Sequence, residues 1–293
     1  MPTPRRFMQL DVFASRLFDG NPLAVVIDAD GLDTTAMQRI AQWTNLSETT
    51  FLLPPTSSAA DYRVRIFTPR QELPFAGHPS VGSAWVAIEA GLVAAGKTAL
   101  VQECAAGLLP VQVAGSGAAL IRVQAPPART STRRTPLHAA LARALRIGLA
   151  PGEGLPRRQR PALDPGQPGR GPPPCAACSR TWPPSRALCL QQRAVGVGVF
   201  GREHAGGAAM AVRAFCPADG IPEDPVTGSA NAAIMAWLGE RGDRDGYGLR
   251  YRASQGREVG RDGIVEVARD LASGAITIGG ACAIGVRGDL QLP

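Results

Sequence analysis

The feature that most constrains the fold is an internal repeat. The pattern Arg-x-Phe-x-Pro occurs at residues 65–69 and again at 213–217, and Pro-x-x-Gly-Ser-Ala occurs at 79–84 and again at 225–230. The two patterns recur in the same order with spacers of nearly equal length. A duplicated structural unit without shared chemistry would explain this repeat. We favour two similar domains that meet across a cleft.

Length and pattern agree with this division. A chain of 293 residues with 45% hydrophobic residues is long enough for two domains, each with its own core. Helical patterns predict helices at 34–43, 79–90, 137–147 and 230–238, with Asp33 or Thr34 as the first cap. Alternation predicts strands at 7–13, 23–27, 49–53, 62–67, 99–102, 109–113, 120–123, 194–200, 211–215, 263–267 and 275–286. The expected fold class is therefore α+β.

Each repeat ends a strand and opens a helix with small residues. Small residues let a ligand approach backbone N–H groups that have no partner within the helix, and the helix dipole adds to their attraction for an anion. Two such helix starts would bind an anionic small molecule. His78 and Asp224 occupy equivalent places in the two repeats, and both can bind polar atoms or move protons.

Other candidates have competing interpretations. Glu48 lies between a predicted helix and a predicted strand, where a carboxylate could be solvated or could cap a turn. Asp224 could be a helix N-cap. Cys175 and Cys178 have the spacing of a metal or redox pair, but no second pair stands at zinc-finger spacing, so we expect no metal.

Composition excludes several functional classes. The net charge of +7 comes from one Pro-rich stretch between Ala128 and Arg193, which holds twelve arginines and two acidic residues but one aromatic, Trp182. A nucleic-acid interface would combine basic and aromatic residues over a folded face, so we expect no nucleic-acid partner. No apolar run approaches the roughly 20 residues that span a bilayer. Without a signal-like N-terminus, we expect a cytoplasmic protein whose six cysteines are reduced.

One segment departs from the rest of the sequence. Residues 151–192 contain ten of the 26 prolines and show neither strand nor helix periodicity. We interpret residues 157–186 as a shifted reading frame and expect this segment to be disordered and cut first by proteases.

Several motifs resemble the phenazine-biosynthesis PhzF-like family. They are Asp11-Val-Phe13, Gly20-Asn-Pro-Leu-Ala-Val-Val26, Ser47-Glu-Thr-Thr-Phe51, Glu72-Leu-Pro-Phe-Ala-Gly-His-Pro79, Glu223-Asp-Pro-Val-Thr-Gly-Ser-Ala230, and Gln255-Gly256 with Gly260-Arg261. The resemblance covers about 8–126 and 195–286.

This resemblance implies a diaminopimelate-epimerase-like fold, with domains at 1–126 and 127–293, although the final strand can pack on the N-terminal domain. Each domain would wrap a mostly antiparallel sheet or barrel around a central helix, with the active site in the cleft between them. A homodimeric isomerase without metal or organic cofactor is expected, acting on a small unsaturated carboxylic or amino acid.

The resemblance also assigns roles to residues. Glu48 would be the acid/base that moves a proton between carbons, and His78 and Asp224 would assist it. Gly77, Gly228 and Ser229 would bind the substrate. Epimerases of this fold use two cysteines where this chain has His78 and Asp224, so two-thiol racemisation is not expected. The alternatives are a non-catalytic small-acid-binding protein and a damaged family member.

Overall fold

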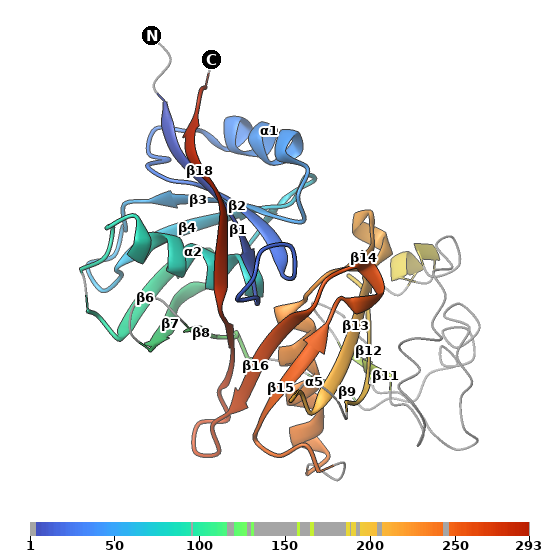
Figure 1. Cartoon of the computed structure of the whole chain (residues 1–293). Coiled ribbons are helices and arrows are strands. Elements are labelled where there is room, and N and C mark those ends of the chain that lie inside the picture. Colours follow the sequence, from blue (N-terminus) through green and yellow to red (C-terminus); the bar gives the residue numbers. More distant parts are fainter. Residues whose placement is uncertain are drawn as a thin grey trace. The chain divides into compact units, whose positions relative to one another are not determined.

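The computed structural model describes residues 4–94, 96–115, 120–127, 130–131, 157–158, 165–166, 186–187, 189–191, 194–203, 207–242 and 246–292. The chain divides into two compact units, one of residues 1–126 with 277–293 and one of residues 127–276. Figure 1 shows their elements. The predicted helix 137–147, most of the segment 151–192 and the pair Cys175–Cys178 lie outside the described residues. No helix in the described part of the chain is long and apolar enough to span a membrane.

The first unit is built on one mixed sheet. Its strands are β1 (Arg5–Val12), β2 (Asn21–Val26), β3 (Thr49–Leu53), β4 (Tyr62–Phe67), β5 (Glu72–Leu73), β6 (Ala99–Cys104), β7 (Gly107–Ala114), β8 (Leu120–Gln124), β17 (Ile276–Gly280) and β18 (Cys282–Leu290). The order is β17-β8-β7-β6-β4-β3-β2-β1-β18, with β5 beside β4. The pairs β2·β3 and β4·β6 are parallel, whereas β1 and β18 are antiparallel, so the two chain ends lie side by side (Figure 1).

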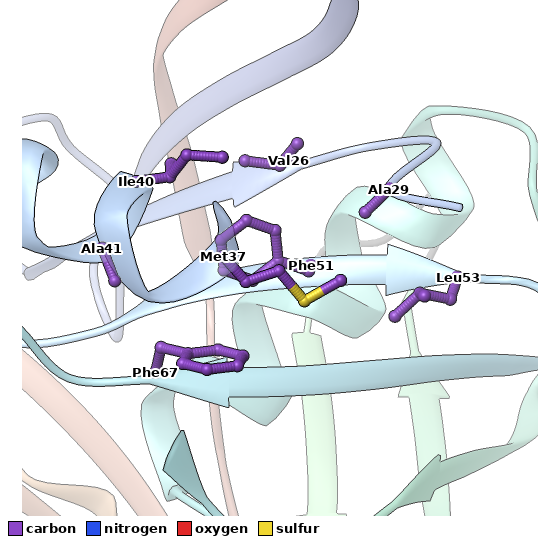
Figure 2. Packing of buried hydrophobic residues seen from close by; sticks show 8 residues of the cluster. All are labelled: Val26, Ala29, Met37, Ile40, Ala41, Phe51, Leu53 and Phe67. Atoms are coloured by element: carbon purple, nitrogen blue, oxygen red, sulfur yellow. The ribbon is translucent and has the colours of Figure 1, made fainter. Parts of the chain in front are cut away.

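Helix α1 (Thr34–Thr44) covers one face of β3 and β4. Asp33 caps it, because its side chain accepts a hydrogen bond from the N–H of Ala36 at 2.7 Å. Figure 2 shows the apolar face of the helix packed on the sheet. The buried cluster consists of Val26, Ala29, Met37, Ile40, Ala41, Phe51, Leu53 and Phe67.

Helix α2 (Gly77–Glu89) packs against β1, β2, β3, β4 and β8. Its Ser83 hydroxyl donates to Thr50 of β3 at 2.9 Å, so β3 is covered by α1 on one face and by α2 on the other. This explains why every residue of β3 is buried. Gly82 allows the close approach, since a Cβ there would lie 2.5 Å from Leu23 and 2.8 Å from Val12.

The strands of the second unit also pair in a mixed parallel and antiparallel pattern. Its described elements are β9 (Thr130–Ser131), β10 (Arg157–Arg158), β11 (Pro165–Gly166), β12 (Val197–Arg202), β13 (Met210–Cys216), the 3₁₀ turn η1 (Pro217–Asp219), β14 (Ile221–Asp224), helix α5 (Gly228–Glu240), β15 (Arg250–Gln255), the 3₁₀ turn η2 (Arg257–Val259) and β16 (Gly263–Arg269). The sheet order is β11-β12-β13-β15-β16, with β14 beside β13, while β9 and β10 form a separate pair. Helix α5 packs against β16 and is buried over most of its length.

The sequence repeat corresponds to a repeat of structure. In the first unit, β4 pairs antiparallel with β5 and parallel with β6, and α2 lies between β5 and β6 in the chain. In the second unit, β13 pairs antiparallel with β14 and parallel with β15, and α5 lies between them in the chain. Both repeats thus have the order strand, short partner strand, helix and parallel strand.

Each repeat also contains an ion pair at the same place. Arg65 on β4 donates two hydrogen bonds of 2.7 Å to Glu72 on β5. Arg213 on β13 donates two of 2.8 Å to Glu223 on β14. In both repeats the arginine also lies over the phenylalanine two residues later in the chain.

Three element predictions need correction. Helix α2 begins at Gly77 rather than at Pro79, because proline is tolerated anywhere in the first turn, where its missing N–H would have no helical partner. The helix predicted at 230–238 spans Gly228–Glu240, so it continues through Gly239, and the Arg269 side chain occupies the space over this glycine. The predicted strand 275–286 is two strands, separated at Ala281.

Candidate active site

Glu48 lies in the connection between α1 and β3. Helix α1 ends at Asn45, whose φ of 52° turns the chain out of the helix, and β3 begins directly after Glu48. The side chain of Glu48 is 15% exposed. A carboxyl group is therefore fixed by two ordered elements and is still within reach of a small ligand.

His78 lies beside Glu48. It is the second residue of α2, and its side chain is 4% exposed. Its Nε2 lies 3.5 Å from Oε2 of Glu48, and its Nδ1 lies 3.3 Å from the side-chain nitrogen of Asn21. Burial lowers the pKa of His78 from 6.5 to about 3. The imidazole is therefore neutral near pH 7, and its contact with Glu48 is not an ion pair.

Asn21 determines which ring nitrogen of His78 carries the proton. Asn21 is fully buried at the start of β2, and its amide nitrogen can only donate a hydrogen bond. Nδ1 of His78 must then accept, so the single proton of the neutral ring lies on Nε2. The result is an N–H group 3.5 Å from the carboxyl group of Glu48, a contact longer than a normal hydrogen bond.

The start of α2 contributes backbone groups at the same place. Ala76 is its N-cap, and no side chain caps the helix. Gly77 and His78 are the first two helical residues, and Pro79 has no N–H. The positive end of the helix dipole and the N–H groups of this first turn can attract the carboxylate of a ligand.

In the second unit, Asp224 is held by Thr227. Asp224 is the last residue of β14, and Thr227 is the N-cap of α5. The Thr227 hydroxyl donates a hydrogen bond of 2.5 Å to Oδ2 of Asp224, and both residues are only 7% exposed. Asp224 is therefore not the N-cap of α5, as one interpretation of the sequence had it. It is a separate carboxyl group just before the helix.

Gly228 and Ser229 open α5 directly behind this carboxyl group. Gly228 is buried, whereas Ser229 is partly exposed. As in α2, no side chain caps the helix. Within residues 224–229, the second unit therefore carries a carboxyl group, a hydroxyl group and the N-terminus of a helix.

The structure thus arranges the predicted residues in two groups. Glu48, His78 and Gly77 belong to the first unit, and Asp224, Gly228 and Ser229 belong to the second.

Three contributing residues were not found from the sequence: Asn21, Thr227 and Gln255. Asn21 was noted only as part of a motif, because a side chain buried at the start of a strand leaves no local pattern. Gln255 was noted only as part of a motif, because its partners lie 28 and 31 residues earlier in the chain.

The described residues contain no group of three or more His, Cys, Asp and Glu side chains that could hold a metal ion. The four cysteines described, Cys104, Cys189, Cys216 and Cys282, are present as thiols, and none of them lies in α2 or α5. The helix starts therefore carry His78 and Asp224 and no thiol.

Comparison with known proteins defines the class. The structure matches the crystal structure of the phenazine biosynthesis protein, PhzF family, from Bacillus anthracis with a TM-score of 0.81 and 24% identity, covering 99% of this chain and 100% of that one. The chain is 34% identical to the trans-2,3-dihydro-3-hydroxyanthranilate isomerase of Pseudomonas aeruginosa over 87% of each chain. The fold is thus that of the PhzF proteins, and the chain is an enzyme of the isomerase class.

The family follows from the sequence match. The chain is also 34% identical to the protein called antisense-enhancing sequence 1 of Schizosaccharomyces pombe, over 95% of this chain and 96% of that protein. The family described as phenazine biosynthesis-like protein matches residues 10–155 and 176–288. The chain belongs to this family, as the motifs around Glu48, His78 and Asp224 predicted.

Proposed function

We propose that this isomerase moves a proton between two carbons of a small unsaturated carboxylic or amino acid, with Glu48 as the acid/base. The observation that carries the proposal is the 3.5 Å contact between the Glu48 carboxyl group and Nε2 of a neutral, buried His78. A carboxyl group near a helix start can take a proton from carbon and return it to another carbon of the same π-system.

Each neighbouring group has a role in this proposal. The Nε2–H of His78 polarises the Glu48 carboxyl group across their 3.5 Å contact, and a neutral ring does so without adding a charge that would hold the carboxylate too tightly to react. The first turns of α2 and α5, with Gly77, Gly228 and Ser229, bind the acidic group of the substrate. Asp224 binds or protonates a polar substituent. As a further part of the proposal, the two groups of residues act on one substrate in a cleft, and each domain wraps its sheet around its central helix. The enzyme is proposed to be a homodimer that needs no metal or organic cofactor.

The relatives suggest where to look for the substrate. One is named as an isomerase of trans-2,3-dihydro-3-hydroxyanthranilate, a cyclic unsaturated amino acid with a hydroxyl group. We therefore propose a substrate of this class, which offers a carboxylate to the helix starts and a C–H acidified by the adjacent π-system to Glu48.

The test is proton exchange in deuterated water. Wild-type protein is incubated with trans-2,3-dihydro-3-hydroxyanthranilate and a panel of related unsaturated acids, and deuterium incorporation is followed by NMR. Glu48→Gln keeps the shape and removes the titrating group, so exchange should fall by about 100-fold or more. Glu89→Gln, a change of the same type on an exposed residue of α2, is the control. Near-normal exchange in Glu48→Gln would contradict the assignment.

The second candidate is a damaged family member that binds a small acid without catalysis. The specific observation in its favour is that the family match stops at residue 155 and resumes at 176. Isothermal titration separates the two, because binding of the same acids without any exchange would identify a binding protein.

A further inference from the structure

We propose that Gln255 is a positioning residue which, through Thr227, holds the Asp224 carboxyl group in its working orientation. This inference rests on the proposed function, because that function places Asp224 at the substrate. Gln255 is the last residue of β15 and is 3% exposed. Its side chain lies against the turn between β14 and α5, which carries Asp224.

The orientation of the Gln255 amide is fixed by the backbone. Its Oε1 accepts from the N–H of Thr227 at 3.0 Å, and its Nε2 donates to the backbone carbonyl of Asp224 at 3.0 Å. A backbone N–H can only donate and a carbonyl can only accept, so the reversed amide would lose both bonds. The Gln255 side chain therefore pairs with the backbone of the turn through one donor and one acceptor, as a neighbouring peptide group in a sheet would.

The same amide sets the direction of the next hydrogen bond. Nε2 of Gln255 also donates to the Thr227 hydroxyl at 2.9 Å. This hydroxyl oxygen then accepts from Gln255 and directs its own proton to Oδ2 of Asp224. A chain of polarised hydrogen bonds thus runs in one direction, from Gln255 through Thr227 to the carboxyl group.

Other buried contacts hold this chain in place. The Asn231 amide, which is fully buried in α5, donates to the backbone carbonyl of Thr227 at 2.9 Å. Gly256 has a φ of 105°, and a Cβ there would lie 2.7 Å from the carbonyl oxygen of Pro225. Only glycine lets the chain leave β15 so close to this turn, which accounts for the Gln255-Gly256 pair in the sequence.

Four variants test the proposal against the exchange assay with trans-2,3-dihydro-3-hydroxyanthranilate. Gln255→Met and Thr227→Val should each lower kcat by about 10- to 100-fold, because a carboxyl group that is displaced by about 1 Å loses its effect, whereas KM should change less than about threefold. The loss in the double variant should be smaller than the two single losses combined, since both residues act on one hydroxyl group, although Gln255 also binds the backbone of the turn. Thr227→Ser keeps that hydroxyl and should restore kcat to within about threefold of wild type.

The matched control is Gln102→Met. Gln102 is a fully buried glutamine on β6 whose amide contacts the hydroxyl groups of Ser80 and Tyr62, neither of which contacts Glu48 or His78 in the contacts described. This substitution removes the same group from the first unit, so it should lower stability without affecting the turn that carries Thr227. Circular dichroism verifies that each variant folds, and if Gln255→Met does not fold, the Thr227→Val and Thr227→Ser pair decides.

A measurement without substrate separates this inference from the proposed function. Hydrogen exchange of the Thr227 amide should be about tenfold or more faster in Gln255→Met and unchanged in Gln102→Met. Unchanged exchange, a wild-type kcat in Gln255→Met, or additive losses in the double variant would overturn the positioning role. An inactive wild type with faster Thr227 exchange in Gln255→Met would instead contradict the proposed function and support the contact.

Discussion

His78 combines two effects that act in the same direction. Burial favours the neutral ring, and the amide of Asn21 allows only the tautomer with its proton on Nε2. The sequence predicted His78 because the histidine opens a repeated helix start. It did not predict the neutral state, since that state depends on Asn21, which lies 57 residues earlier in the chain.

The lowered pKa of His78 predicts how stability depends on pH. The folded-state pKa of about 3 lies below the ordinary value of 6.5, so the unfolded chain binds a proton between these values where the folded chain does not. The contribution of His78 to the free energy of unfolding is thus fully present above pH 6.5. It is lost as the pH falls, by up to about 1.4 kcal/mol per pH unit.

His78→Gln removes this dependence. Between pH 7 and pH 5, urea unfolding should show wild type losing about 2 kcal/mol more stability than the variant. Glu48 lies beside the ring, so the double variant with Glu48→Gln measures its share of the effect. Equal losses in wild type and His78→Gln would show that the buried ring does not resist protonation.

At the level of elements, the repeat predicted more than the local patterns did. Matching motifs indicated equivalent helices, and α2 and α5 each follow a short strand that pairs with β4 or β13. The short strands themselves, β5 and β14, were not predicted. Two to four residues are too few to show alternation, and these strands exist because their neighbours offer unpaired edges.

The two equivalent ion pairs should differ in their contribution to stability. The side chains of Arg213 and Glu223 are 3% and 2% exposed, whereas those of Arg65 and Glu72 are 25% and 32% exposed. Arg213→Met leaves a buried carboxylate without its main partner and should cost about 3–5 kcal/mol. Arg65→Met leaves a solvated carboxylate and should cost about 1 kcal/mol or less.

Chemical denaturation of both variants measures this difference. The double variant Arg213→Met with Glu223→Leu serves as the control, because replacing both charges by apolar groups should recover much of the loss. Equal costs at the two sites would mean that the second pair is solvated in solution.

At the level of the whole molecule, the family match isolates one stretch of sequence. The family description fits residues 10–155 and 176–288 and leaves out 156–175, which overlap over residues 157–175 with the segment 157–186 that we interpret as a shifted reading frame. The relative from Schizosaccharomyces pombe aligns with 95% of this chain and 96% of its own length, so the likeness extends to both sides of this stretch. The sequence on both sides of residues 156–175 therefore belongs to one family, and these residues do not follow its pattern.

This interpretation predicts that the gene encodes a patterned sequence in another frame across codons 157–186. Restoring that frame should add apolar residues at strand or helix spacing, and each one that becomes buried contributes about 1.5–3 kcal/mol. With two or more buried, the restored chain should be more stable by at least about 3 kcal/mol in urea unfolding. A Gly/Ser insert of the same length is the control and should give no gain. Alternative frames without any strand or helix period, or a restored chain no more stable than this one, would show that the printed segment is native to the protein.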